Sequence, residues 1–169
     1  METIRPMEQT WVRILLWLAV IAVCGMIFLF SAQTGDESAE TSGKVVDCLI
    51  GILVKGYELL SEIRQQEIRE IASLMVRKLA HFGEFALLAF LVRLLMRSYR
   101  IAGGGLKAWL CATLYAATDE LHQVFVSARG PSLTDVGIDS MGAALGAGLA
   151  CLILWLCGRR RRAAGTPPA

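Results

Sequence analysis

Ionisable side chains interrupt otherwise apolar stretches at a few positions of this 169-residue chain. His81 and Glu84 are three residues apart, with Lys78 one turn before them, and Asp119 and His122 show the same spacing. In a helix, residues three or four apart share a face. A histidine with a carboxylate one turn away can move protons, hydrogen-bond a polar headgroup or help to hold a metal. These two histidine sets are therefore the first candidates for chemistry.

The segments that carry these residues are apolar enough for a lipid environment. Hydrophobic residues make up 55% of the chain, charged residues 19%, and the mean hydropathy is +0.53. A membrane-spanning helix needs roughly 20 mostly apolar residues. Four segments approach this, at residues 11–30, 79–96, 106–125 and 136–157. The sequence predicts an all-α integral membrane bundle of four transmembrane helices, with the lipid bilayer as its partner.

Composition also excludes several classes of protein. The net charge is only +2, and basic residues do not alternate with aromatic ones along any segment, so a nucleic-acid partner is not expected. The five cysteines form no CxxC pair, which argues against a zinc site or a disulfide scaffold.

Basic residues predict the orientation in the membrane. They gather before and at the start of the first segment, between the second and third, and directly after the fourth: Arg5, Arg13, Arg97, Arg100, Lys107 and Arg159 to Arg162. With four spans, all three groups fall on one side, which the positive-inside rule assigns to the cytoplasm. Residues 1–10 and the basic tail 159–169 would then be cytoplasmic, flanking a transmembrane domain at 11–158. One alternative remains, in which the first segment is a signal peptide cleaved near Ser31-Ala32-Gln33, leaving three spans.

The long connection between the first and second spans is predicted to contain an external amphipathic helical segment at residues 45–78. Val46, Leu49, Ile50 and Leu53 recur at helical spacing and form one apolar face. Such a helix would lie on the outer leaflet or cover the bundle as a lid. From residue 65 the same spacing continues, which predicts that the second span extends outward.

With this topology, every span contributes polar groups to the external end of the bundle. The residues are Ser31, Gln33, Lys78, His81, Glu84, Asp119, Glu120, His122, Gln123, Arg129, Asp135 and Asp139. Ionisable residues at membrane depth usually face a bundle interior or an aqueous cavity. We therefore expect a pocket in which His81 and His122 transfer protons or hydrogen-bond. Glu84, Asp119 and Glu120 would orient the histidines or act as bases.

The remaining polar residues have binding roles in this interpretation, and each has a structural alternative. Lys78 and Arg129 would hold an anionic headgroup. Alternatively, Lys78 pairs with Glu84, and Arg129 pairs with Asp135 or Glu120. Asp135 also fits a capping box with Ser132.

A metal site is not assigned. Asp119-x-x-His122 and His81-x-x-Glu84 resemble the acid/histidine pairs of di-metal bundles, but only one of them keeps the acid-first order. The sequence does not identify a cofactor. Gly142-x-x-x-Gly146 gives the fourth span a small-residue face for close helix packing.

Four separated motifs resemble the VanZ-like membrane protein family. They are Phe30-Ser31-Ala32-Gln33 through Ser38, Arg77 to Phe85, Asp119 to Phe125, and Arg129 to Asp135 followed by Asp139 and Gly142. Phe85 stands where tyrosine is common in the family, and Ser127 where proline is common. The resemblance implies a bacterial inner-membrane protein, in a family whose namesake is associated with resistance to teicoplanin. No accepted reaction comes with the family.

The leading hypothesis is an extracytoplasmic pocket that binds or acts on a lipid-linked or lipidated envelope ligand. One alternative is a membrane-embedded hydrolase or transferase that uses histidine and carboxylates, with or without a metal. Another is a non-catalytic scaffold in which the polar cluster only ties the helices together.

Overall fold

The computed structural model describes residues 6–33, 35–126 and 132–163, and within these ranges the chain is helical without a strand. The α-helices are α1 (Pro6–Ser31), α2 (Gly35–Leu53), α3 (Glu62–Ser98), α4 (Gly104–Val126) and α5 (Leu133–Ala163). A single 3₁₀ turn, η1 (Tyr57–Leu59), connects α2 to α3. The predicted all-α fold is confirmed.

Three of these helices are long and apolar enough to cross a membrane: Gln9–Ser31 in α1, Glu62–Ser98 in α3 and Leu133–Arg160 in α5. Many of their large apolar side chains face outward, such as Leu15, Ile21 and Trp155. The chain is therefore a multi-pass membrane protein. Helix α4 does not qualify by composition, because Asp119 and the polar residues after it lower the hydropathy of its last turns. The fourth span stays a prediction.

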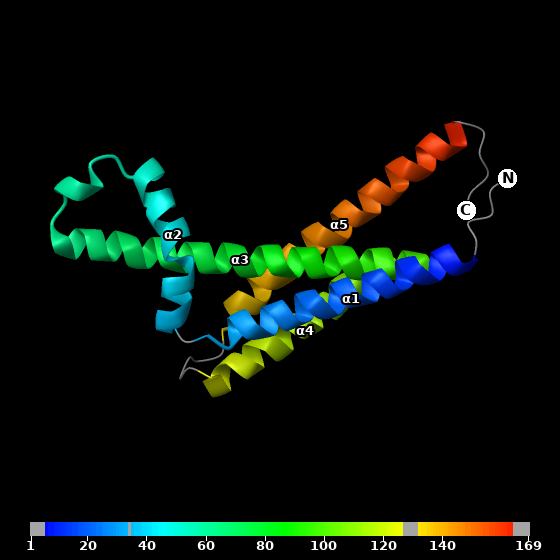
Figure 1. Ribbon diagram of the computed structural model, residues 1–169, viewed down its shortest axis with the longest axis horizontal. Coiled ribbons are helices and arrows are strands. Elements are labelled where there is room, and N and C mark those ends of the chain that lie inside the picture. Colours follow the sequence, from blue (N-terminus) through cyan, green and yellow to red (C-terminus); the bar gives the residue numbers. More distant parts are fainter. Residues whose placement is uncertain (1–5, 34, 127–131, 164–169) are drawn as a thin grey trace.

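Helix α3 is the central element, and α1, α4 and α5 pack against it (Figure 1). The start of α1, the connection from α3 to α4 and the end of α5 lie at one end of the molecule. The core between the helices is built mostly from small and branched residues: Val20, Val23, Ile27, Phe85, Leu88, Ala89, Ala108, Ala112, Ala116, Ala143 and Ala147. Small side chains let the helix backbones approach closely.

The closest approach is between α3 and α5. A Cβ atom on Gly142 would overlap the backbone carbonyl of Phe82, and one on Gly146 would overlap that of Ala86. The predicted use of this glycine pair for close packing is confirmed, and its partner is α3. The contact fixes the crossing of α3 and α5 and therefore the distance between polar residues of the two helices, such as Lys78 and Asp135.

The region predicted as one amphipathic segment at 45–78 consists of two helices. Helix α2 begins at Gly35 and ends at Leu53, Gly56 turns the chain with φ of 75°, and α3 begins at Glu62. Val46 and Ile50, from the predicted apolar face, are buried in the contact of α2 with the first half of α3. The helix of the second predicted span is extended as its spacing predicts, because α3 continues without a break from Glu62 to Ser98. The external location of this extension stays a prediction.

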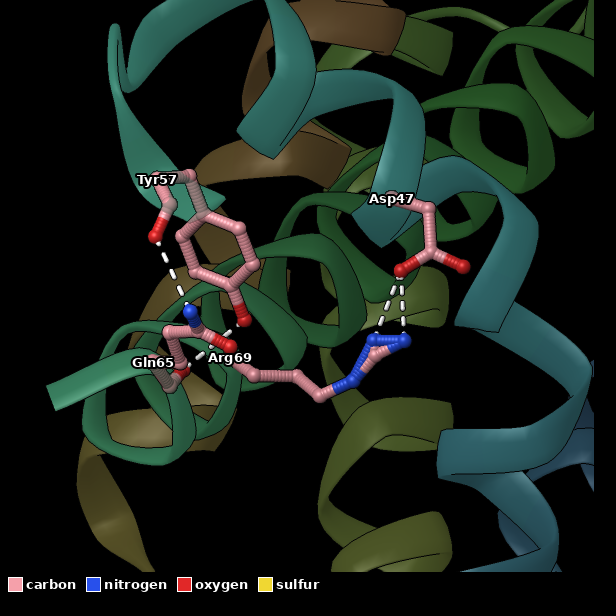
Figure 2. A network of polar contacts seen from close by, with 4 residues as sticks. All are labelled: Asp47, Tyr57, Gln65 and Arg69. Atoms are coloured by element: carbon pink, nitrogen blue, oxygen red, sulfur yellow. Dashed lines mark hydrogen bonds and ion pairs between the residues drawn. The ribbon is translucent and has the colours of Figure 1, made fainter. Parts of the chain in front are cut away.

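Polar contacts fasten this helical hairpin, as Figure 2 shows. Both terminal nitrogens of Arg69 donate to Oδ1 of Asp47, at 2.5 and 2.6 Å. The Tyr57 hydroxyl donates to the backbone carbonyl of Gln65, and Gln65 Nε2 donates back to the carbonyl of Tyr57, each at 3.1 Å. These bonds hold α2 and η1 to α3 beyond the end of the main bundle.

Candidate functional site

A cavity of about 290 Å³ lies between α3, α4 and α5. Its lining residues are Leu74, Arg77, Lys78, His81, Glu120, Gln123, Asp135, Ile138 and Asp139. They lie in the middle part of α3, in the first turns of α5 and in the last turns of α4, away from the basic connection between α3 and α4. Seven of these nine side chains are polar or charged, so the cavity suits a polar ligand group.

The α3 wall follows directly from helical spacing. Leu74, Lys78 and His81 are separated by four and then three residues, and Arg77 lies four residues before His81. Residues so spaced share one face. No proline or helix-ending glycine interrupts α3 here, so the face is continuous and rigid.

The α4 wall is set by a repeat of small residues. Ala108, Ala112 and Ala116 are four residues apart and almost fully buried, and the same step leads to Glu120. Gln123 continues this face, and its Nε2 donates to Oδ2 of Asp119 at 3.3 Å. The packing of the alanines therefore turns Glu120 and Gln123 toward the cavity.

The α5 wall begins with a helix cap that involves α4. Ser132 precedes the first helical residue, and its Oγ accepts a hydrogen bond from the backbone N–H of Asp135 at 3.2 Å. In a capping box the Asp135 carboxylate would accept the N–H of Ser132 in return. Here Glu120 Oε1 accepts that N–H instead, at 2.5 Å. Of the predicted capping box, the bond to the Ser132 hydroxyl is therefore present, and the return bond is made by Glu120 in place of Asp135.

The Asp135 carboxylate is consequently available to α3. Lys78 Nζ donates to Asp135 Oδ1 at 2.5 Å and forms an ion pair with it. The alternative that pairs Lys78 with Glu84 is wrong, because Lys78 lies over α5. This ion pair connects two cavity walls at residues far apart in the sequence.

Glu84 and Asp119 lie behind the cavity wall. His81 Nδ1 is 3.9 Å from Glu84 Oε2, which is the predicted histidine–carboxylate neighbourhood on one helix. Asp119 is buried, and so is Ser31 at the end of α1. These residues support the wall that the lining residues form.

His122 and Gln33 are placed differently from His81. The His122 ring contacts the ring of Phe28 in α1, with centroids 4.6 Å apart, and is not part of the cavity lining. Gln33 follows the end of α1, where its backbone N–H donates to the carbonyl of Phe30 at 3.2 Å. The two histidines therefore do not face the same cavity.

Asp139 is the most unusual residue of the lining. Its exposed fraction is 6%, and within the described ranges no side chain or backbone group hydrogen-bonds to its carboxylate. The carboxylates of Glu120 and Asp135 line the same cavity, together with Arg77, Lys78 and His81. A buried carboxylate among other carboxylates is costly unless a cation compensates it.

The family model described as VanZ/LLP1 matches residues 16–155, which is more than half of the chain. The chain belongs to the VanZ/LLP1 family. The match covers every lining residue of the cavity, α2, α3 and α4 in full, and most of α1 and α5. No curated protein and no solved structure matches the chain.

In this VanZ/LLP1 protein, six predicted site residues line the cavity: Lys78, His81, Glu120, Gln123, Asp135 and Asp139. Ser31, Glu84 and Asp119 are close behind them, whereas Arg129 lies outside the described residues. Sequence reasoning did not assign a role to Arg77, Leu74 or Ile138. Helical spacing was the signal that could have found them, because Arg77 lies four residues before His81 and Leu74 four before Lys78. Ile138 lies three residues after Asp135.

The acids and histidines do not gather as metal ligands do. Among the residues that the structure describes, no three His, Cys, Asp or Glu side chains lie close enough together to hold one ion. What the walls offer instead is two cations on α3 facing carboxylates on α4 and α5, with His81 in the lining beside them. This arrangement can bind a ligand through hydrogen bonds and ion pairs.

Proposed function

We propose that this VanZ-like protein uses the cavity between α3, α4 and α5 to bind the polar head of a lipid-linked or lipidated component of the cell envelope. The main support for this proposal is a cavity of about 290 Å³ between apolar helices, in which Arg77, Lys78 and His81 lie together with carboxylates. A ligand with an apolar tail would keep the tail in the bilayer and place its head in the cavity. Arg129, by its place in the sequence between α4 and α5, is assigned to the anionic part of the same head.

In this proposal the chain crosses the bacterial inner membrane four times, with both termini in the cytoplasm. Helix α4 has 23 residues, so at 1.5 Å per residue it is about 34 Å long, which suits a hydrocarbon core of roughly 30 Å. It also packs against α1, α3 and α5 as an inner member of a bundle would. The basic residues at the other end, such as Arg97, Lys107 and Arg159, support a cytoplasmic location for that end. The cavity then opens at the outer headgroup level.

Antibiotic susceptibility tests the ligand-binding role. A susceptible Gram-positive host would express the wild type, His81→Ala or Lys78→Met at matched membrane levels, and the inhibitory concentrations of teicoplanin and vancomycin would be measured. We expect protection against teicoplanin, which carries a lipid chain, that is at least several-fold and that both variants lose. His122→Ala serves as a comparison, because it also removes an imidazole but outside the cavity lining. Full protection by both cavity variants would contradict the proposal.

A catalytic role is the second candidate. His81 lies 3.9 Å from Glu84, and a histidine next to a carboxylate on a cavity wall is suited to proton transfer. In that case a hydrolase or transferase would convert the bound lipid-linked substrate. Incubation of the purified protein with membrane lipids, followed by mass spectrometry of the lipids, would show a product that His81→Ala does not form.

A further inference from the structure

Asp139 is a buried carboxylate in the cavity lining, and among the residues that the structure describes none forms a hydrogen bond or ion pair with it. Only 6% of the Asp139 residue is exposed, yet it belongs to the cavity lining. The other ionisable residues of the lining are Arg77, Lys78, His81, Glu120 and Asp135, and Lys78 is already paired with Asp135. A positively charged group of a ligand would supply the missing compensation.

The cations of the cavity are held on the opposite wall. Lys78 Nζ is already bound to Asp135 Oδ1 at 2.5 Å, and Arg77 is adjacent to Lys78 on α3. Asp139 and Glu120 belong to α5 and α4. Positive charge therefore lines one side of the cavity and negative charge the other, which is the complement of a ligand that carries both signs.

The volume and the apolar part of the lining limit the chemical class of head that the cavity can hold. A volume of about 290 Å³ is at the lower end of ligand pockets, which hold roughly 300–1,000 Å³. Leu74 and Ile138 supply apolar surface beside Lys78 and Asp139. Such a cavity suits a compact head with its alkyl linkers rather than an entire lipid.

We propose that the cavity recognises a head that joins a phosphate to a primary ammonium, with the ammonium on Asp139 and the phosphate on Arg77 and Lys78. This inference rests on the proposed function, in which the cavity takes a polar head. A primary ammonium offers three N–H donors to a carboxylate, and charge-assisted bonds of this kind are the strong ones. A quaternary ammonium has no N–H donor, and a glycerol head has no positive charge. Asp139 therefore distinguishes heads that are otherwise alike.

Lipid retention by the purified full-length protein tests the inference. Native mass spectrometry would compare phosphatidylethanolamine, its N-methylated forms, phosphatidylcholine and phosphatidylglycerol, all with the same acyl chains and at equal concentration. We expect phosphatidylethanolamine to be retained about tenfold more than phosphatidylglycerol, with retention falling at each added methyl group. The wild type alone gives this result, so the test does not depend on a variant that folds.

Variants then separate the inference from the proposed function. Asp139→Asn should lower phosphatidylethanolamine retention to the level of phosphatidylglycerol, and Asp139→Glu should keep the preference. Arg77→Met should weaken both lipids. Glu67→Gln, an exposed acid on the hairpin part of α3, is the matched control and should change neither.

The outcomes are distinguishable. Equal retention of the lipids, combined with weaker retention by Arg77→Met, would overturn the ammonium inference and leave the headgroup site intact. Lipid retention that no cavity variant affects would overturn both. Soluble O-phosphoethanolamine separates the sources, because displacement of the lipid assigns the site to the head alone, whereas continued lipid retention assigns it to the membrane-borne form.

Discussion

Lys78 and Asp135 form an ion pair of 2.5 Å between α3 and α5, 57 residues apart in the sequence. Asp135 reaches Lys78 because Glu120 takes the hydrogen-bonding role that Asp135 would otherwise have at the cap of α5. One small exchange of partners thus links all three walls of the cavity.

Exchanging the two charges tests whether the cluster is only a scaffold. The side chains are 45% and 39% exposed, so Lys78→Met or Asp135→Asn alone should cost at most about 1 kcal/mol of stability. The double variant Lys78→Asp with Asp135→Lys restores an ion pair but moves the cation to α5. We expect its thermal unfolding midpoint in detergent to match the wild type while its protection against teicoplanin is lost. Protection retained by the double variant would favour the scaffold.

Replacing Glu120, the hydrogen-bond acceptor on α4, tests whether the N-terminal cap of α5 depends on α4. Glu120→Gln keeps an oxygen that accepts the Ser132 N–H, whereas Glu120→Ala removes it. We expect faster amide hydrogen exchange in the first turn of α5 for Glu120→Ala than for Glu120→Gln. Ser132→Ala should raise exchange in the same turn and cost about 1 kcal/mol. Unchanged exchange in Glu120→Ala would show that the cap does not need α4.

Alanine at the helix crossing tests what sets the cavity width. Gly142→Ala and Gly146→Ala introduce a methyl group against the backbone carbonyls of α3, so the helices must separate. Overpacking of this kind costs about 1–3 kcal/mol, which should appear as a lower unfolding midpoint. Gly148→Ala is the matched control on the same helix, because nothing lies within 4 Å of its added methyl group. Equal effects of all three substitutions would argue against the contact.

Two native cysteines report how often the chain crosses the membrane. Cys48 on α2 and Cys157 near the end of α5 are both exposed. If α4 crosses, they lie on opposite sides; if only α1, α3 and α5 cross, they lie on the same side. With all other cysteines replaced, a membrane-impermeant thiol reagent should label Cys48 in intact cells and Cys157 only after permeabilisation. Labelling of both in intact cells would contradict four spans.

Apolar periodicity made much of the helical architecture predictable. Residues 11–30, 79–96 and 136–157 all lie in helices that can cross a membrane, and the outward extension of α3 follows the spacing that continues through Ile68 and Ile71. The start of α2 was not predictable in this way, because Gly35 and Asp36 begin a polar stretch without apolar periodicity. The hydropathy of α4 is lowered by the same acids that form the site.

The sequence allowed us to predict which residues form the polar cluster, but not which of them line the cavity. Spacing within one helix correctly brought His81 next to Glu84. The rotation of α4 about its axis depends on which residues α3 and α5 accept between them, and only the buried alanine repeat up to Ala116 fixes it. That rotation directs Glu120 to the cavity and His122 to Phe28. Contacts between helices decide such details, and one helix alone does not contain them.

The glycine contact between α3 and α5 also sets the angle at which the two helices cross. The two helices touch at Gly142 and Gly146 and diverge beyond them toward the end of α5 (Figure 1). Lys78 and Asp135 lie on the other side of this contact from the diverging ends. A change in the crossing angle of α3 and α5 would therefore alter the distance between Lys78 and Asp135 and the spread of the far helix ends together.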